Sequence, residues 1–345
     1  MRGTSYECWM ALLFVLARSL FGADLSAPSQ APYPPSPVIQ TIAFAPKEEI
    51  IPRGHGDNTP VTWADDDCIY TAFNDGYGFE PRSPKELSAG FAKILGNPPD
   101  FRGENIPSPT GEQYGSGAKG PKTSGILMVD GVLYLWLRNV YKNSKLAWSK
   151  DHAKTWEYGF TFTTSFGCPT FLNFGKNYDG ARDEYVYIYS QDGPTAYEIY
   201  DGVVQARVPK TRITEREAYE FYKGVDENGR SLWSKNINER AHAFVFPNHC
   251  QRLDVVYNSG IKRYMMAIGY NHKGGWGIYD APEPWGPWTT VFHSEKWDCG
   301  DTFSYRLPSK WIGKDGKELY LVFSALGGGG KYYAFSVRKI TLETK

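Results

Sequence analysis

The stretch Ser-Gly-Ile-Leu-Met-Val-Asp-Gly-Val-Leu-Tyr-Leu-Trp-Leu, residues 124–137, contains an apolar run, a tight Asp130-Gly131 turn and a second, aromatic-rich apolar run. An Asp-Gly or Asn-x-Gly turn between two such runs is the strongest short-range signal of a β-hairpin. Four further stretches share this outline, at residues 57–73, 169–189, 253–268 and 311–323. Five similar hairpins predict radial repetition. We therefore expect an all-β fold, a five-bladed β-propeller.

The segment before the hairpins predicts export. Residues 1–23 combine a charge at Arg2 with a short apolar core at Met10–Ala17, as a signal peptide does. Residues 24–37 form a Pro-rich linker, and we expect this whole N-terminal signal and linker segment to be disordered. Residues 38–345 then form a single β-propeller domain, closed by a strand near residues 38–45. We expect a secreted or periplasmic protein with no membrane span, because spanning needs ~20 apolar residues.

Composition limits the class of partner. The formal net charge is zero and no Lys/Arg cluster occurs, which argues against nucleic acid. Aromatic residues make up 16% of the chain, with 11 Trp and 24 Tyr. Sheet packing is the first explanation of this content, although the same rings also stack on sugars. With the candidate carboxylates described below, we expect a polysaccharide or oligosaccharide partner. The chain has no nucleotide-binding or metal-binding motif, so no cofactor and no metal are predicted, and we expect a monomer.

Four cysteines follow the predicted signal peptide, at positions 68, 168, 250 and 299. In an exported protein they can form two disulfides, and Cys250 and Cys299 precede strands of neighbouring repeats. Buried free thiols are the equal alternative. Both interpretations stay open at this point.

Two local patterns predict other elements. Residues Ser149–Trp156 resemble the Asp-box turn of sialidase-like propellers, with Ala153 in place of the usual glycine. In such a turn the Asp151 carboxylate caps backbone amides, away from the ligand-binding face. Residues 215–222 show a helical pattern with Thr214 as N-cap, and residues 85–95 are a weaker helix candidate.

Propeller geometry separates the polar residues into two sets. The entry to each innermost strand and the loop between the second and third strands share one face, where ligands usually bind. Glycoside hydrolysis usually needs two carboxyl groups across the scissile bond. On this face we select Asp57, Asp75 and Asp301 as catalytic candidates, with Asp57 first as base or nucleophile. Gly54 and Gly56 beside it allow close backbone approach.

Further polar side chains on the same face are candidate substrate-binding residues. They are Arg53, His55, Asn58, Lys122, Arg138, Asp192, Glu198, His249 and His272. Carboxylates in the hairpin turns, such as Asp65, Asp130 and Asp315, fall on the opposite face and are expected only to turn the chain.

Several segments together resemble a known family. They are residues 56–66, 71–76, 180–187, 206–210 and 280–288. The likeness covers residues 50 to 340 and is to a bacterial propeller family long labelled as of unknown function, some members of which are endo-D-arabinanases acting on mycobacterial cell-wall arabinan. The resemblance implies a five-bladed glycoside hydrolase. It implies a catalytic role for Asp57 and identifies no second catalytic residue.

Other functions compete with a polysaccharide hydrolase. A sialidase needs three arginines around a carboxylate, and of the arginines only Arg53 and Arg138 are well placed. A polysaccharide lyase would use His249, His272, Tyr77 and Lys122. A non-catalytic glycan-binding propeller is the alternative from a different class. Two carboxylates that converge favour hydrolysis, whereas an isolated carboxylate among aromatic rings favours binding.

Overall fold

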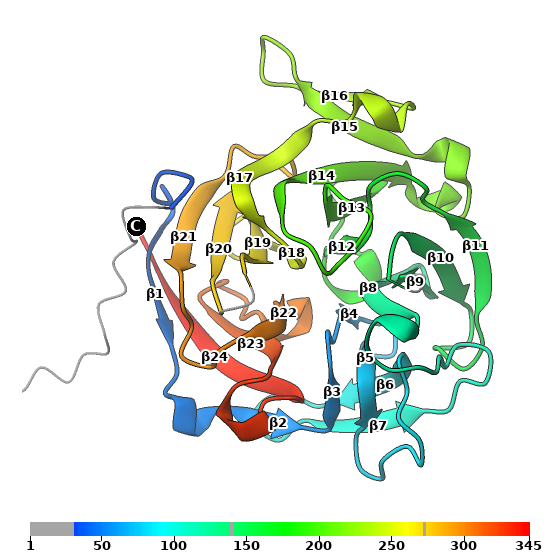
Figure 1. Cartoon of the computed structure of the whole chain (residues 1–345). Coiled ribbons are helices and arrows are strands. Elements are labelled where there is room, and N and C mark those ends of the chain that lie inside the picture. The colour runs from blue at the N-terminus through cyan, green and yellow to red at the C-terminus, as the bar shows by residue number, and fades with distance from the viewer. Residues whose placement is uncertain (1–30, 139–140, 272–273) are drawn as a thin grey trace, which may run out of the picture.

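The computed structural model describes residues 31–138, 141–271 and 274–345. Within these ranges the chain forms 24 strands and eight 3-10 helices of three residues each, without an α-helix. Figure 1 shows the sheets arranged around a ring in chain order. The predicted signal peptide lies outside the described residues. None of the helices in the described ranges has the length and hydropathy to cross a membrane.

The first two sheets follow the predicted hairpins. The first contains β3 (His55–Asp57), β4 (Val61–Trp63), β5 (Ile69–Gly78), β6 (Gly90–Leu95) and β7 (Arg102–Ile106). The second contains β8 (Lys122–Val129), β9 (Val132–Arg138), β10 (Ser144–Ser149) and β11 (Glu157–Thr161). Successive strands pair antiparallel in both.

A ten-stranded sheet joins two antiparallel units through the parallel pair β12–β18. The first unit contains β12 (Thr170–Asn173), β13 (Tyr185–Gln191), β14 (Tyr200–Pro209), β15 (Glu220–Val225), β16 (Ser231–Ser234) and β17 (His242–Cys250). The second contains β18 (Leu253–Asn258), β19 (Arg263–Gly269), β20 (Trp276–Ala281) and β21 (Thr289–Ser294). The β15–β16 hairpin projects from the ring in Figure 1.

The last sheet joins the two ends of the chain. It contains β22 (Thr302–Arg306), β23 (Glu318–Ala325), β24 (Phe335–Thr344), β1 (Ile39–Phe44) and β2 (Ile51–Arg53). Strand β1 pairs antiparallel with β24, as the sequence predicts, and this pairing closes the ring and leaves β24 without a free edge. The all-β propeller-like architecture is therefore confirmed. The count of five blades stays a prediction. It is reached only if the ten-stranded sheet is counted as two blades.

Part of the predicted linker packs on the ring. The Tyr33 hydroxyl accepts a hydrogen bond from the Val245 amide at 2.8 Å, and its ring lies 5.0 Å from that of Phe244. The Ser36 amide donates to the Thr290 carbonyl at 2.9 Å. Ordered packing therefore begins before residue 38, where the sequence placed the start of the domain.

Both helix predictions are wrong. Residues 216–218 form only the 3-10 helix η5 (Arg216–Ala218), and residues 220–225 form β15. Tyr219 and Phe221 are fully buried on alternate positions, and Phe221 pairs with Ala206 of β14. Tertiary pairing thus overrides the local helical pattern. In the weaker candidate, residues 90–95 form β6.

The fifth hairpin differs in detail from its prediction. Its first strand is β22, whereas Trp311 lies in the 3-10 helix η7 (Ser309–Trp311). Trp311 is buried and its ring lies 5.4 Å from that of Phe101. The apolar residue Trp311 therefore packs between sheets and does not belong to a strand. The remaining 3-10 helices are η1 (Lys47–Glu49), η2 (Gly117–Lys119), η3 (Lys176–Tyr178), η4 (Lys210–Arg212), η6 (Ile237–Glu239) and η8 (Gly328–Gly330).

Aromatic rings fill the spaces between neighbouring sheets. The rings of Phe91 and Trp156 stack at 4.9 Å between the first two sheets. Trp276 and Tyr305 stack at 4.2 Å between β20 and β22. Each such ring buries on the order of 150–250 Å², so much of the aromatic content serves the core.

Arg306 connects the innermost strands at the centre of the ring. One terminal nitrogen donates to Asn58 Oδ1 at 2.9 Å and to the Ser124 carbonyl at 3.1 Å. The other donates to the Leu253 carbonyl at 2.9 Å and lies 3.5 Å from Asp254. Because Arg306 belongs to β22, this single side chain links β22 to β8, to β18 and to the segment before β4.

The ring has two faces with different chemistry. We call the face at the entry to the innermost strands the site face, and the face of the hairpin turns between first and second strands the turn face. The predicted Asp-box turn lies on the turn face, since His152 Nε2 is 2.8 Å from Asp65 Oδ1 in the β4–β5 turn. Asp151 accepts hydrogen bonds there from the Thr155 amide at 2.9 Å and the Thr155 hydroxyl at 2.6 Å. Cys68, Cys168, Cys250 and Cys299 are free thiols.

Candidate functional site

Asp57 is the last residue of β3. This strand follows β2 of the last sheet and pairs with β5 of the first sheet. Its Cα pairs with that of Asn74 in β5. A Cβ on Gly76 would lie 2.2 Å from the His55 carbonyl oxygen, and one on Gly56 3.0 Å from the Asn74 carbonyl oxygen. These glycines therefore allow β3 and β5 to approach each other. The sequence suggested that Gly56 lets a ligand approach the backbone. In the structure it is strand β5 that approaches Gly56.

The Asp57 carboxyl is buried, with only 6% of the residue exposed. Burial raises its pKa from 3.8 to about 6, and the nearby charge of Asp75 acts in the same direction. The charge of Arg252, the Tyr333 hydroxyl and the charge of Lys122 lower the pKa and partly offset burial. Asp57 therefore titrates close to neutral pH, as a group that transfers protons needs to do.

Asp75 and Lys122 lie beside Asp57 and form a buried ion pair. The Tyr333 hydroxyl lies 3.0 Å from Asp57 Oδ2 and 3.0 Å from the Asp75 backbone carbonyl. These four residues form what we call the Asp57 cluster. They come from β3, β5, β8 and the loop between β23 and β24, so four separate segments of the chain converge on it.

His55 lies at the edge of the Asp57 cluster. Its ring centroid is 5.2 Å from that of Tyr333 and 5.3 Å from that of Tyr77. Burial and the charge of Arg82 lower its pKa, and its Nδ1 has no hydrogen-bond partner. The ring is therefore held near Asp57 in a form that favours the neutral imidazole.

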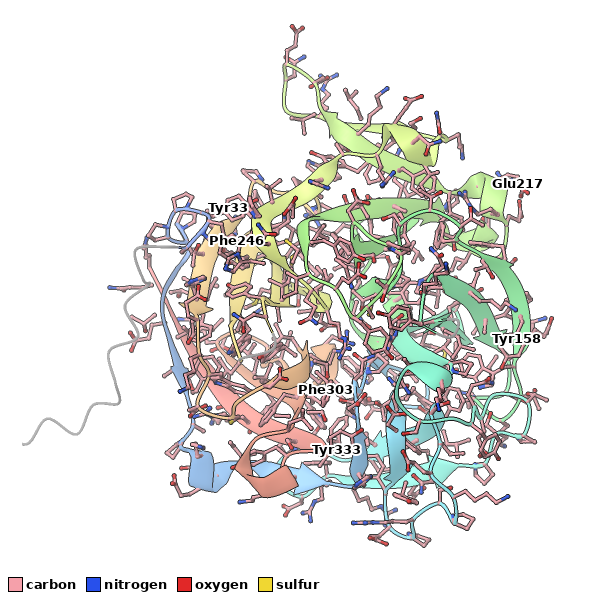
Figure 2. All side chains as sticks on the ribbon, viewed as in Figure 1. Tyr33, Tyr158, Glu217, Phe246, Phe303 and Tyr333 are labelled. Carbon is pink, nitrogen blue, oxygen red and sulfur yellow. The ribbon has the colours of Figure 1, made fainter. Side chains whose placement is uncertain are left out.

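Two arginines face the ring of Tyr197 on the same face. The guanidinium carbon of Arg138 lies 5.4 Å from the Tyr197 centroid, and that of Arg252 lies 5.9 Å from it. Arg252 also lies 5.5 Å from the centroid of Phe303 and donates to the Phe303 carbonyl at 3.2 Å. We call Arg138 and Arg252 the arginine pair. Figure 2 shows Phe303 and Tyr333 near the inner ends of the strands, with Tyr158 and Glu217 at the rim.

Asn58, next to Asp57 in the sequence, has a structural position. It is fully buried, donates to the Thr123 carbonyl at 2.6 Å and accepts from Arg306 at 2.9 Å. These contacts occupy its amide on both sides. Asn58 therefore stabilises the centre of the ring and does not reach a ligand as the sequence suggested.

Other predicted residues lie on the site face outside the Asp57 cluster. Asp192 accepts from Arg240 at 2.8 Å and from Ser165 at 2.8 Å, and these contacts with that of His242 outweigh burial and lower its pKa to about 2. Glu198 is exposed and accepts from the Tyr200 hydroxyl at 2.9 Å. His249 stacks on Phe246 at 4.1 Å, and both residues belong to β17.

The last three predicted residues are separate again. Arg53 ends β2 and lies 5.7 Å from the centroid of Phe101, away from Asp57. Asp301 stands directly before β22, and its backbone carbonyl accepts from the Leu326 amide at 2.9 Å. His272 lies outside the described residues.

Sequence reasoning missed Tyr333, Arg252, Tyr197 and Phe303. A usable signal existed for two of them. Arg252 directly precedes β18, and Tyr333 follows the Gly327–Gly330 run in a loop between second and third strands, the two positions already assigned to the site face. Phe303 and Tyr197 look like ordinary aromatic residues in the sequence, so only the structure could single them out.

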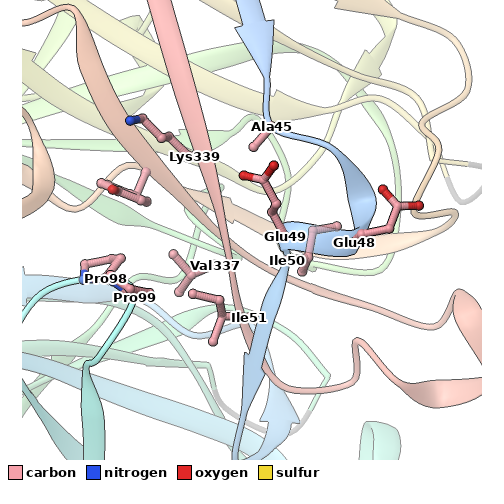
Figure 3. Close-up of a pocket in the computed structure, with 10 residues that line it drawn as sticks. Ala45, Glu48, Glu49, Ile50, Ile51, Pro98, Pro99, Val337 and Lys339 are labelled. Atoms are coloured by element: carbon pink, nitrogen blue, oxygen red, sulfur yellow. The ribbon is translucent and has the colours of Figure 1, made fainter. Parts of the chain in front are cut away.

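Two pockets lie outside the Asp57 cluster. One, shown in Figure 3, has a volume of about 390 Å³ between η1, β2 and β24 and includes Glu49, Pro98 and Lys339. The other has a volume of about 500 Å³ and is lined by Phe73, Leu87 and other residues of the first sheet. Its size falls in the range of ligand pockets, and its wall includes Arg82, which acts on His55.

Within residues 31–138, 141–271 and 274–345, no group of three or more His, Cys, Asp or Glu side chains lies close enough together to hold a metal ion.

Comparison with known proteins identifies the family. The model of the domain of unknown function DUF4185 matches residues 128–337. The chain belongs to this family. None of the curated proteins matches its sequence.

Solved structures share the fold of this DUF4185 protein. A Bacteroides ovatus protein is 14% identical, with 87% of this chain and 93% of that chain covered and a TM-score of 0.53. The GH43_1 enzyme from Xanthomonas citri complexed with xylotriose is 13% identical, with 88% and 90% covered and a TM-score of 0.51. The RS223 β-xylosidase is 13% identical, with 86% and 95% covered and a TM-score of 0.50. At these identities the likeness shows the fold, that of a β-propeller.

Proposed function

We propose that this DUF4185 protein is an exported glycoside hydrolase that acts on a polysaccharide, with Asp57 as the group that transfers the proton. One observation carries the proposal: a carboxyl group with a pKa of about 6 is buried on the site face beside a second carboxyl group, that of Asp75. Two carboxyl groups in different environments are the usual requirement for glycoside hydrolysis. The β-xylosidase and the GH43_1 enzyme that share this fold support a glycan substrate.

The Tyr333 hydroxyl can hydrogen-bond to both forms of Asp57: it donates to the ionised carboxylate and accepts from the protonated one. A tyrosine hydroxyl has one proton. When Asp57 is ionised, that proton can go to Asp57 or to the Asp75 carbonyl, but not to both. When Asp57 is protonated, it donates to Tyr333, which donates to the Asp75 carbonyl, and both 3.0 Å contacts become hydrogen bonds. The raised pKa therefore favours proton transfer over the role of a permanently ionised nucleophile.

The proposed step follows from these roles. Protonated Asp57 donates its proton to the glycosidic oxygen as the bond from that oxygen to the anomeric carbon breaks, and water adds its hydroxyl to the carbon. The remaining proton of that water returns to the Asp57 carboxylate, so Asp57 is protonated again at the end of the cycle. Asp75, paired with Lys122, supplies the second carboxyl group.

An arabinan is the first substrate to test, because the sequence resembles a family with endo-D-arabinanases. Purified protein is incubated with arabinans, xylans and other plant and bacterial polysaccharides, and new reducing ends are measured. We expect release from at least one substrate. Glycan binding without release would reject hydrolysis and support a non-catalytic glycan-binding propeller.

A further inference from the structure

The arginine pair has no carboxylate partner in the part of the chain that the structure describes. Arg138 is only 3% exposed, and the Nε atoms of both Arg138 and Arg252 are buried without a hydrogen-bond partner. None of the ion pairs in the described part of the chain includes either residue. The Nε atom of Arg306 also has no partner, but the terminal nitrogens of Arg306 contact Asp254 and several backbone acceptors. Buried polar groups in native proteins usually have partners, so the arginine pair is poised for one that the chain does not supply.

The surroundings of the arginine pair do not balance its charge. Lys122 is already paired with Asp75. Asp57, whose charge acts on Arg252, supplies at most one negative charge against the two positive charges of the arginine pair. The rings of Tyr197 and Phe303 contribute cation–π contacts, which are weaker than a charge-assisted hydrogen bond to an anion. A net positive charge remains beside the Asp57 cluster.

The position of the arginine pair relates it to the proposed reaction. Arg252 lies against Phe303, and the Phe303 ring is 5.9 Å from that of Tyr333, whose hydroxyl contacts Asp57. A ligand on the arginine pair is therefore a near neighbour of the carboxyl group that transfers the proton.

We infer that Arg138 and Arg252 bind the carboxylate of a sugar acid, so that the glycan recognised by this protein contains uronic acid units. A planar guanidinium pairs with a planar carboxylate through two parallel hydrogen bonds, and one negative charge matches the excess at the site. This inference rests on the proposed function in taking a glycan as ligand, but it concerns binding and not bond cleavage.

Binding of a substrate carboxylate would also change the protonation state of Asp57. The groups that act on Asp57 are Arg252, Asp75, Tyr333 and Lys122, and Arg252 has the largest lowering effect on its pKa. A substrate carboxylate on Arg252 would neutralise that charge. The pKa of Asp57 would then rise further, and the bound substrate would itself keep the catalytic proton in place.

The test compares acids with matched neutral sugars. Glucuronate and galacturonate, and the methyl ester of each, are titrated into the full-length protein by calorimetry. We expect at least one acid to bind about 10-fold or more tightly than its ester, and Arg252→Gln to remove that difference. Arg252 is partly exposed, which makes this variant safer for folding than one at buried Arg138. If neither acid binds more tightly than its ester, the inference is overturned.

Two controls separate the alternatives. Arg182→Gln removes an exposed arginine that stacks on Tyr257 and Tyr264 at the turn face, and it should leave the preference for the acid unchanged. Glucose 6-phosphate tests for a general anion site, and equal, Arg252-dependent binding of this phosphate would overturn the carboxylate assignment. Because binding is measured without turnover, acid binding without hydrolysis would reject the proposed function alone. Hydrolysis of neutral glycans without acid binding would reject this inference alone.

Discussion

Asp57 on the site face and the carboxylates of the turn face lie in opposite environments. On the site face Asp57 is buried, and its pKa is raised. On the turn face Asp65 and Asp130 are exposed, and Asp67 has its pKa lowered, chiefly by the Trp63 indole N–H, which donates to it at 2.9 Å. Turn carboxylates stabilise the chain best when ionised, whereas a proton-transferring carboxyl must be able to hold its proton. This difference separates Asp57 from the turn carboxylates as the candidate for proton transfer, and Asp192 on the site face, with its lowered pKa, resembles the turn carboxylates.

The largest expected difference between the faces is in activity. On a substrate found in the polysaccharide screen, Asp57→Asn should lower kcat by ~10²–10⁴-fold, because the amide cannot exchange the proton. Asp130→Asn, the matched change on the turn face, should leave kcat nearly unchanged. Initial rates of reducing-end release measure both, with circular dichroism to verify folding. Equal activity of Asp57→Asn and wild type would remove the catalytic role of Asp57.

The next largest effect concerns stability at the ring centre. Arg306→Met should lower the free energy of unfolding by about 3–5 kcal/mol, because it leaves the buried Asp254 carboxylate without its ion-pair partner. Lys176→Met removes a partner 3.7 Å from exposed Asp67 on the turn face and should cost at most about 1 kcal/mol. Urea denaturation measures both variants.

A double variant makes this comparison sharper. Asp254→Asn removes the charge that Arg306→Met leaves unpaired, so the double variant should be more stable than Arg306→Met alone. If the double variant is no more stable, the cost of Arg306→Met comes from its other contacts across the ring and not from the ion pair.

A third effect is the pH dependence of stability. The pKa of Asp57 is about 6 in the folded protein against 3.8 for an ordinary aspartate, so the folded state holds the proton more tightly. Ionisation of Asp57 therefore destabilises the folded state. This destabilisation grows as the pH rises from about 4 to about 6 and is fully present above pH 6. Asp57→Asn should be more stable than wild type at pH 7, by at most about 3 kcal/mol, with the gain disappearing near pH 4. A gain independent of pH would exclude titration of Asp57 as its cause.

The elements of the fold followed closely from the sequence. Hairpin turns such as Asp130-Gly131 mark β8–β9, and closure by residues 38–45 matches β1. The helix expected at residues 215–222 failed because the burial of Tyr219 and Phe221 is decided by β14, a strand ten or more residues away. Local patterns cannot report such long-range pairing.

The candidate site was less accessible to sequence reasoning. Asp57, Asp75 and Lys122 were selected from their places on the site face, and the structure brings them together. Tyr333 lies 276 positions from Asp57 in the sequence, and nothing local to either residue indicates that they meet. Asn58 shows the converse: its position suggested a ligand contact, but its amide is occupied by Arg306 and Thr123.

The smallest expected effect tests the turn face directly. Asp151 accepts hydrogen bonds from Ser149 and Thr155, and these outweigh burial and lower its pKa. Asp151→Ala removes them from a partly exposed turn and should cost about 1–2 kcal/mol in the free energy of unfolding, with kcat of the folded protein unchanged. Unfolding curves and initial rates on the same preparations separate the two quantities. A loss of kcat without a loss of stability would show that this turn communicates with Asp57 through the sheet, and the two faces could then no longer be treated as independent.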